Sequence, residues 1–201
     1  MRPLTRMNGP TRIVCLRHGE STFNAAHRAT GRDPDHRDAR LTPRGQGQAR
    51  AARAALAEIP FDLVVVSPLT RAIETTALAF ADHPAEPKIL VEVLHRECQE
   101  SSCDVGRVAS EIAAEFPHLD VGHLPEVWWH AEEGVEDGRH PVEPRHLFDQ
   151  RVAGFREWLR ARPEATIAVV GHGTFFFHLT GIWLDNCETV ELDLDAASAA
   201  A

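Results

Sequence analysis

Two histidines stand directly after apolar runs, in positions where an imidazole could act on a substrate. His18 follows residues 13–16 and Arg17, and His172 follows residues 167–170 with a glycine on either side. An imidazole nitrogen is a competent nucleophile near neutral pH because its ordinary pKa is about 6.5. The planar guanidinium of Arg17 suits the oxygens of a phosphate group. Packing alone does not readily explain two such histidines, so we interpret them as parts of one site.

A third polar segment follows the apolar run at residues 63–66. Ser67 and Pro68 are typical of a helix start, because serine can cap a helix and proline tolerates its first position. Arg71 would then lie in the first turn, where free backbone N–H groups also attract an anion. The segment therefore adds a second guanidinium to the predicted anion site.

The elements that must position these residues alternate along the chain. Short apolar runs that suit buried strands alternate with helical patterns, which is typical of an α/β domain with a mostly parallel sheet. In such sheets ligands bind outside the carboxyl ends of the strands, where the polar segments stand. The predicted strands are residues 13–16, 63–66, 89–93, 167–170 and, at an edge, 190–194. The predicted helices are residues 42–58, 67–81, 105–116, an amphipathic helix from 145, and 174–184.

The length and the pattern predict one domain over residues 1–201, with a core at about 11–195. Residues 95–145 break the alternation and are rich in Gly, Pro, His and Glu. We interpret them as an insertion that serves as a lid or a substrate-binding region. Trp128 and Trp129 either wall a pocket or anchor this insertion, and anchoring is favoured because large aromatics mostly serve packing.

The composition limits the classes of partner. Lys and Arg number 21 against 30 Asp and Glu, which gives a net charge of −9, and 43% of the residues are hydrophobic. The apolar content excludes a disordered chain, and the negative charge disfavours nucleic acid, whose phosphates need clustered cations. No apolar run approaches the ~20 residues that span a bilayer. We therefore expect neither a nucleic-acid nor a membrane partner.

The cysteines and the first residues predict a cytoplasmic protein. The four cysteines form no Cys-x-x-Cys pair, and Cys98 with Cys103 lacks the second pair that a zinc site needs. Residues 1–10 contain two arginines but no apolar core behind them, so we expect no secretory signal. We expect reduced, unpaired thiols.

The ordered motifs resemble those of the histidine phosphatase superfamily, on its phosphoglycerate-mutase-like branch. Each motif is weak alone, but the set is specific and spans most of the chain. The resemblance implies a three-layer α/β/α sandwich with a mostly parallel central sheet. The matching residues are 17–21 with Asn24, 41–42 with Gly45 and 48–49, 67–72 with 74–75, and 171–173.

The same resemblance implies roles for individual residues. His18 resembles the nucleophile that takes the phosphoryl group. Arg17, Arg71 and His172 resemble the groups that bind the phosphoryl oxygens. Asn24 equally suits a simple turn. The further substrate contacts that the resemblance implies are Asn24, Thr30, Gly31 and Gly173.

The family supplies a general acid from the segment after the third strand. Glu97 is our choice there, and its rivals are Glu92, Glu100 and Asp104. The implied reaction is the two-step hydrolysis of a small phosphomonoester. His18 attacks phosphorus while Glu97 protonates the leaving alcohol, and Glu97 then activates the water that cleaves the phosphohistidine. No metal or cofactor is implied, because the arginines neutralise the phosphoryl charge.

Three other functions compete with this one. A phosphoglycerate mutase would use the same histidine, but Cys98 and Gln99 follow Glu97 where that group has Arg-x-Tyr-Gly, which favours hydrolysis. A non-catalytic binding protein would be expected to lack His18 or Arg71. A metal protein is suggested only by the 12 histidines, among which those of the insertion form no close pair. The family resemblance also allows a homodimer.

Several arginines follow the first histidine motif. They could meet a second anionic group on the substrate, but three aspartates stand among them and we favour a solvated loop. These arginines are Arg28, Arg32, Arg37, Arg40 and Arg44, and the aspartates are Asp33, Asp35 and Asp38.

Overall fold

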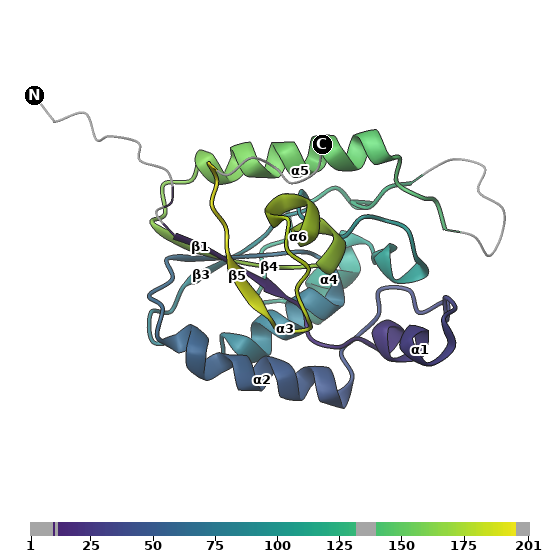
Figure 1. The fold of residues 1–201 in the computed structure, drawn as a ribbon, viewed down its shortest axis with the longest axis horizontal. Helices are drawn as coiled ribbons and strands as arrows, with labels where there is room; N and C mark the ends of the chain where they lie inside the picture. The colour runs from purple at the N-terminus through teal and green to yellow at the C-terminus, as the bar shows by residue number, and fades with distance from the viewer. Residues whose placement is uncertain (1–9, 11, 132–139, 196–201) are drawn as a thin grey trace, which may run out of the picture.

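The computed structural model describes residue 10 and residues 12–131 and 140–195. A five-stranded sheet lies at its centre, in the order β3-β2-β4-β1-β5 (Figure 1). The first four strands of this order are parallel, and β5 pairs with β1 in the antiparallel sense. The strands are β1 (Arg12–Arg17), β2 (Leu63–Val66), β3 (Lys88–Val91), β4 (Thr166–Gly171) and β5 (Thr189–Glu191).

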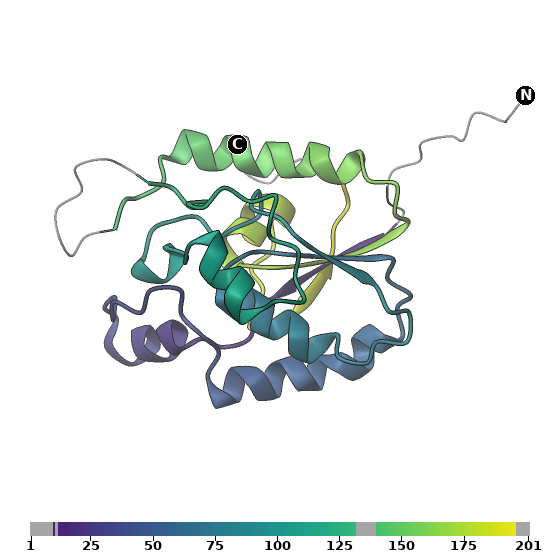
Figure 2. The same cartoon turned by 180° about the vertical axis from the view of Figure 1, so that it is seen from behind.

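Helices cover both faces of the sheet. Figure 1 shows α5 and α6 above it and α2 and α3 below it, and α4 lies on the lower side, as the reverse view in Figure 2 shows. The predicted three-layer α/β/α sandwich with a mostly parallel sheet is confirmed. The helices are α1 (Thr22–Thr30), α2 (Pro43–Ala57), α3 (Thr70–Ala79), α4 (Ala109–Glu115), α5 (Arg145–Arg160) and α6 (Gly173–Thr180).

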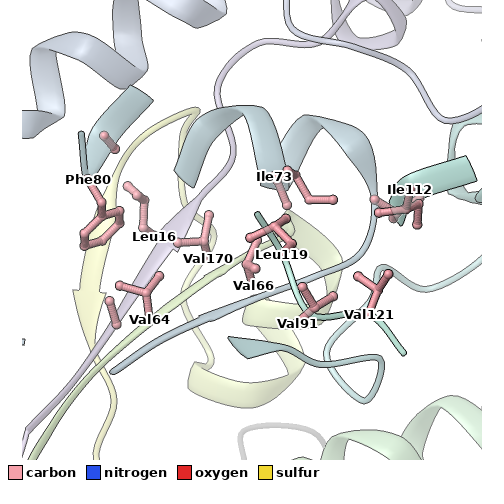
Figure 3. Close-up of a cluster of buried hydrophobic side chains, with 14 of the residues drawn as sticks. Leu16, Val64, Val66, Ile73, Phe80, Val91, Ile112, Leu119, Val121 and Val170 are labelled. Carbon is pink, nitrogen blue, oxygen red and sulfur yellow. The ribbon is translucent and has the colours of Figure 1, made fainter. Parts of the chain in front are cut away.

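The lower core lies between the sheet and α2, α3 and α4. Side chains alternate along a strand, so every second residue of each central strand faces this side. Leu16 of β1 and Val64 of β2 pack there with Ile73 of α3 and Ile112 of α4 (Figure 3). This layer fixes the strands from below and leaves their carboxyl ends free to carry polar residues.

The upper core is aromatic and lies under α5 and α6. Cys15 and Val65, the alternate residues of the same strands, face this side. The predicted amphipathic helix supplies Phe148 and Phe155, which are fully buried, and α6 supplies Phe175. Edge-to-face contacts join Phe175 to both rings, with centroids 6.1 Å and 5.6 Å away. The upper core therefore holds α6, and with it the segment after β4, in one place.

Helix α3 begins later than its sequence predicts. It starts at Thr70 with Leu69 in the capping position and no side-chain cap, so Ser67 does not cap it. The Ser67 hydroxyl lies 2.8 Å from Nε2 of His172 instead. The prediction of a helix starting at Ser67 was wrong by three residues: the Ser67 hydroxyl accepts from the backbone N–H of Leu69, before the first helical residue, and contacts the distant histidine.

Helix α1 was missed from the sequence. Its signal is a capping box in which the Ser21 hydroxyl accepts from the backbone N–H of Asn24 and the Asn24 side chain accepts from that of Ser21, both at 3.1 Å. Only Phe23 of this helix is buried, so no apolar period marks it. Gly31 ends the helix with φ of 67°, a left-handed conformation that glycine adopts without strain.

Other boundaries differ from the predictions by a few residues. Strand β3 ends at Val91, β5 covers only Thr189–Glu191, and α6 stops at Thr180 because Gly181, with φ of 79°, turns the chain. The helix predicted over residues 105–116 covers only α4, after a short 3-10 turn, η1 (Ser102–Asp104). The predicted start of α2 is confirmed, with the Thr42 hydroxyl accepting from the backbone of Gly45.

The insertion is tied to the core by a tryptophan. Trp128 is 4% exposed and packs in the lower core with residues of β2 and α3. Inside the insertion, its indole N–H donates to the backbone carbonyl of Arg107 at 2.8 Å. A Cβ at Gly106 would lie 2.1 Å from the Trp128 ring, so only glycine lets the ring pass there. These contacts favour the anchoring role. Residues 132–139, inside the insertion, and residues 1–9, where a secretory signal was not expected, lie outside the described residues.

Across the part of the chain that is described, none of the helices combines the length and the apolar character needed to cross a membrane.

Candidate active site

His18 lies one residue beyond β1, where the sheet holds its backbone. Its N–H donates to the carbonyl of Gly171 at 2.9 Å, and its carbonyl accepts from the Asn186 side chain at 2.9 Å. The ring nitrogen Nδ1 lies 2.7 Å from the Gly19 carbonyl, which can only accept, so Nδ1 carries the proton. Nε2 is therefore the nitrogen with a free electron pair.

Gly19 lets the chain turn sharply after this histidine. A Cβ at Gly19 would lie 2.5 Å from the Gly45 carbonyl oxygen, and one at Gly45 would lie 2.1 Å from the Glu20 carbonyl oxygen. Both distances are shorter than real Cβ contacts. The two glycines thus allow the loop after β1 to pack directly on the start of α2.

Arg71 reaches Nε2 of His18 from the first turn of α3. Its Nε donates to His18 Nε2 at 3.2 Å, and its two terminal nitrogens donate to the Cys103 carbonyl at 2.6 Å and to Asp104 Oδ1 at 2.9 Å. Arg71 is only 2% exposed. The sequence predicted Arg71 as an anion contact in a first helical turn, and the structure places it against His18.

Arg17 and His172 lie on the other side of the site. Arg17 donates through NH1 to the Leu184 carbonyl at 2.6 Å, and its Nε is buried without a hydrogen-bond partner in the described part of the chain. A Cβ at Gly173 would lie 3.2 Å from the Arg17 guanidinium carbon, so this glycine lets the guanidinium approach. Such an unused buried donor costs free energy unless a ligand satisfies it.

His172 is the residue before α6, and its ring lies 5.3 Å from that of His18 between centroids. Its Nε2 meets the Ser67 hydroxyl, whereas its Nδ1 is buried and finds no partner among the described residues. The sequence indicated Ser67 only as a helix cap. No local signal predicts the contact between a serine after β2 and a histidine after β4, although parallel neighbours bring them together.

Both site histidines are held in the neutral form. The pKa of His18 lies well below its ordinary value because burial and the guanidiniums of Arg71 and Arg17 disfavour a charged ring. The pKa of His172 is lowered in the same way by burial and then by Arg71 and by His18 itself. The unprotonated Nε2 of His18 therefore persists into mildly acidic solution.

Glu97 brings a carboxylate to the start of α6. Its oxygens accept from the backbone N–H groups of Thr174 at 3.1 Å and Phe175 at 2.9 Å. The residue is half-buried and lines the cavity described below. Burial, with the neighbouring carboxylate of Asp104, raises the pKa of Glu97, while Arg71 and the backbone N–H groups oppose the rise. A carboxyl with a raised pKa can give a proton at neutral pH.

The other carboxylates proposed as general acid have different surroundings. Glu92 accepts from the backbone of Leu94 and does not line the cavity. Asp104 is occupied by Arg71 and by the backbone N–H groups of Glu100 and Ser101. Glu100 lines the cavity but is exposed. Glu97 is thus the carboxylate with both a raised pKa and no ion pair.

Arg17, His18, Arg71 and Glu97 line one cavity of about 170 Å³. It brings together residues from the end of β1, from the starts of α1, α3 and α6, and from the irregular chain between β3 and η1 with η1 itself. The 170 Å³ suits a small group such as a phosphoryl ester rather than a polymer. Its lining residues are Arg17, His18, Phe23, Asn24, Arg71, Glu97, Cys98, Glu100, Ser101, Cys103, Asp104 and Thr174.

Four residues suggested as substrate contacts are absent from the lining of this cavity. His172, which is fully buried, and Gly173 lie at the start of α6, and the other two lie at the end of α1. Thr30 and Gly31 are absent from its lining; the Thr30 hydroxyl donates to the Ala26 carbonyl at 2.9 Å, and Gly31 serves as the helix C-cap. Asn24, in contrast, lines the cavity while it caps α1. Phe23 and Cys103 line it as well, and neither was predicted from the sequence.

Most of the arginines after the first motif have carboxylate partners. Arg28 binds Glu20 at 2.6 Å, Arg44 approaches the same carboxylate at 3.6 Å, and Arg40 binds Glu74 and Glu115. These pairings favour the solvated, charge-balanced loop over a second anion site.

The cysteines and the acidic groups are arranged for neither disulfides nor metals within the described residues. All four cysteines are unpaired, as expected. No group of three or more His, Cys, Asp or Glu in the described ranges is placed to hold a metal ion. Burial raises the pKa of the cavity thiol Cys98 to about 12, so this thiol stays protonated at neutral pH.

A buried imidazole close to two guanidiniums, in a cavity that also holds a carboxyl, has the chemistry that phosphoryl transfer needs. The model of the histidine phosphatase superfamily (branch 1) matches residues 13–198. The chain belongs to this superfamily and is an enzyme of the phosphatase and phosphoryl-transfer class.

Individual relatives include both phosphatases and mutases by name. The chain is 27% identical over 221 residues to a phosphoglycerate mutase-like protein of Arabidopsis thaliana, covering 90% of this chain and 78% of that protein. It is 29% identical over 181 residues to a glucosyl-3-phosphoglycerate phosphatase of Mycolicibacterium vanbaalenii, covering 87% and 76%.

Solved structures share the fold at lower identity. The alpha-ribazole phosphatase from Shigella flexneri superposes with a TM-score of 0.61 at 22% identity, covering 90% of each chain. The phosphoglycerate mutase from Bacillus anthracis superposes with a TM-score of 0.58 at 17% identity, covering 92% of this chain and 88% of that one. The fold is therefore compatible with hydrolysis and with mutase chemistry, and the choice between them depends on the site.

Proposed function

We propose that this enzyme hydrolyses small phosphomonoesters through a phosphohistidine on Nε2 of His18. The observation that carries the proposal is the tautomer of His18. Because Nδ1 donates to the Gly19 carbonyl, Nε2 is the unprotonated nitrogen, and its electron pair accepts a hydrogen bond from Arg71 Nε at 3.2 Å, a donor that a bound phosphoryl oxygen would take over. Phosphorus bound there would be attacked by the nitrogen that the protein leaves unprotonated.

The unused donors around Nε2 suit the phosphoryl oxygens. Arg17 Nε is buried with an unfilled hydrogen bond in the described structure, and so is Nδ1 of His172. Charge that develops on the phosphoryl oxygens in the transition state would be stabilised by donors already fixed in place. The arginines supply the positive charge that this reaction requires, so the proposed mechanism uses no metal and no cofactor.

Glu97 would act as acid and then as base. In the first step it protonates the leaving alcohol oxygen as His18 Nε2 bonds to phosphorus and the ester bond breaks. In the second step it takes a proton from water, whose oxygen bonds to phosphorus as the bond to His18 breaks. The products are the free alcohol and inorganic phosphate, and the enzyme returns to its starting protonation state.

The charges around the rest of the cavity favour hydrolysis of esters with uncharged leaving groups. Beyond the phosphoryl site and the general acid Glu97, the cavity is lined by Glu100, by Asp104, which Arg71 binds, and by uncharged side chains such as Ser101 and Asn24. Within the described lining, no cation other than Arg17 and Arg71 is available to bind a carboxylate. A phosphoglycerate, which carries a carboxylate, is therefore a poorer match than a polyol phosphate.

The test is phosphate release from a panel of monoesters in the presence of EDTA, with 4-nitrophenyl phosphate, glycerol phosphate and phosphoglycerate included. We expect metal-independent release, faster from glycerol phosphate than from phosphoglycerate, and none from His18→Ala. Isomerisation of phosphoglycerate with a bisphosphate primer, without net phosphate release, would instead establish a mutase. No turnover of any kind would contradict both.

A further inference from the structure

A buried ion pair lies directly behind the segment that carries Glu97. Arg151 of α5 is 7% exposed and Glu143 is 4% exposed. Arg151 Nε and NH2 bind the two oxygens of Glu143 at 2.9 Å and 2.5 Å. Neither residue lines the cavity, and the proposed reaction uses neither.

The remaining donors of Arg151 all point to one stretch of backbone. NH1 donates to the carbonyls of Leu94 at 2.7 Å and Arg96 at 2.8 Å, and NH2 donates to the carbonyl of Glu97 at 3.1 Å. A guanidinium has five N–H groups, and here all five are used. Three of these N–H groups bind backbone carbonyls within the four-residue stretch 94–97, which ends at Glu97.

This arrangement fixes Glu97 from both ends. Arg151 holds its carbonyl, and the start of α6 holds its carboxylate through Thr174 and Phe175. The two supports also touch each other, because the Arg151 guanidinium lies 5.6 Å from the centre of the Phe175 ring. A shift of α5 relative to α6 would therefore move the Glu97 carboxylate relative to His18.

Stability alone does not explain such a pair. Desolvating a guanidinium and a carboxylate costs several kcal/mol per ion. A protein with apolar residues of the same volume in place of the pair is often equally stable or more stable. An ion pair in which every N–H group of the arginine has an acceptor fixes the position of the groups that it binds, and its contribution to stability is secondary. The bidentate geometry also needs arginine, since lysine has only three donors and no fixed plane.

We propose that Arg151, oriented by Glu143, is a positioning residue for the general acid Glu97. The inference rests on the proposed function, in which Glu97 protonates the leaving oxygen. Proton transfer requires the donor within hydrogen-bond reach of that oxygen, and a displacement of about 1 Å can cost about 10²-fold in rate. Removing the constraint should therefore slow the step that Glu97 assists and little else.

The same helix offers a matched control. Arg156, five positions along α5, also donates to backbone carbonyls, those of Leu179, Asp193 and Leu194. These carbonyls belong to the end of α6 and the residues after β5, away from Glu97. Arg156→Lys makes the same chemical change on the same helix and leaves the Glu97 segment untouched.

The experiment compares Arg151→Lys, Arg156→Lys and Glu97→Gln on two substrates. Glycerol phosphate has a leaving alcohol that must be protonated, whereas 4-nitrophenyl phosphate releases a stable phenolate. For Arg151→Lys we expect kcat/KM on glycerol phosphate to fall about 10- to 100-fold and on 4-nitrophenyl phosphate less than about threefold. Arg156→Lys should leave both values within about twofold of the wild type.

Glu97→Gln separates a failure of the inference from a failure of the proposed function. If Glu97→Gln shows the leaving-group dependence and Arg151→Lys slows both substrates equally, the positioning role is wrong and the general acid stands. If Glu97→Gln itself shows no such dependence, the general-acid assignment fails and the inference falls with it.

Glu143→Gln is the second variant in case Arg151→Lys does not fold. It keeps one oxygen acceptor for Arg151 and for Arg96, whose NH2 lies 2.8 Å from Glu143, and removes the negative charge. We expect the same leaving-group dependence at a smaller size, together with a changed high-pH limb of kcat/KM on glycerol phosphate. Unchanged kinetics on both substrates in a folded Glu143→Gln protein would overturn the proposal.

Discussion

The two sides of the cavity are built in different ways. On the phosphoryl side, Arg17, His18, Arg71 and His172 each stand at the end of a strand or the start of a helix. On the leaving-group side, Glu97, Glu100 and Ser101 lie in the irregular chain between β3 and η1. The phosphoryl side is positioned by the sheet, whereas the leaving-group side is positioned by side chains that bind its backbone. In the proposed mechanism, regular structure therefore sets the binding of phosphate, and a long-range network sets the delivery of the proton.

If this comparison is correct, the largest effect should follow from a change on the phosphoryl side. Arg71→Lys keeps a charge but loses the Nε contact to His18 and one of the two terminal contacts. We expect kcat/KM to fall about 10²- to 10³-fold on every phosphomonoester, because one preorganised donor to developing charge is worth that much.

The control is Arg53→Lys. Arg53 of α2 donates through Nε and NH2 to the Leu78 carbonyl and lies away from the cavity. It should change kcat/KM by less than about twofold. A loss for Arg71→Lys that depends on the leaving group would show that the two sides are not separable.

The second prediction concerns the general acid. Glu97→Gln should lower kcat/KM on glycerol phosphate about 10²-fold or more and affect 4-nitrophenyl phosphate far less. Burial raises the pKa of Glu97, so the wild-type rate should fall as pH rises through that value, when the proton is lost. Glutamine does not titrate, so the variant should lack this limb in a pH profile on glycerol phosphate. If Glu97→Gln showed the same fall in rate with rising pH, the titrating group would be another residue.

A smaller effect is expected at the exposed edge of the leaving-group side. Glu100→Arg replaces a negative charge by a positive one, so kcat/KM on phosphoglycerate relative to glycerol phosphate should rise about fivefold, as exposed charge pairs are worth up to about 1 kcal/mol. Glu111→Arg on α4 makes the same change on an exposed residue that does not line the cavity. Equal ratios in both variants would remove Glu100 from the substrate-binding surface.

The smallest expected effect is on the free energy of unfolding, and it concerns His95. His95 donates its Nε2–H to the Val170 carbonyl at 3.1 Å and stacks on Phe155, and burial lowers its pKa to about 3. Its unfolded form takes up a proton below about pH 6.5, so folding stability contributed by the neutral ring is lost as pH falls from 6.5 toward 3.

We therefore expect wild-type unfolding free energy to fall about 1 kcal/mol more than that of His95→Gln between pH 7 and pH 5.5. Urea unfolding of both proteins at the two pH values measures this difference. Parallel changes in the two proteins would mean that His95 is not neutral in the folded state.

The difference between the two sides of the cavity also explains which parts of the fold and the site could be predicted from the sequence. The strand ends at His18 and His172 and the helix start at Arg71 were recognisable, because an apolar run followed by a polar motif is a local signal. The fold class followed from the same alternation. Helix α1 escaped because its capping box was not followed by an apolar period, and Ser67 was misassigned because its partner is 105 residues away.

The sequence carries weaker signals for the residues of the leaving-group side. Glu97 was chosen over Glu92, Glu100 and Asp104 by resemblance, and what distinguishes it physically is the start of α6, 77 residues later in the chain. Arg151 gave no sequence signal beyond one polar position on an amphipathic helix. Networks of side chains that bind distant backbone carbonyls leave no periodicity, so sequence reasoning does not detect them.

The most direct test of the account is a search for the phosphorylated enzyme. The protein is mixed with 4-nitrophenyl phosphate, quenched within one turnover in alkali, in which phosphohistidine survives, and analysed by peptide mass spectrometry. The account predicts one phosphoryl group per chain on His18 and none in His18→Ala. Turnover without a phosphorylated intermediate, or a phosphoryl group on another residue that persists in His18→Ala, would contradict it.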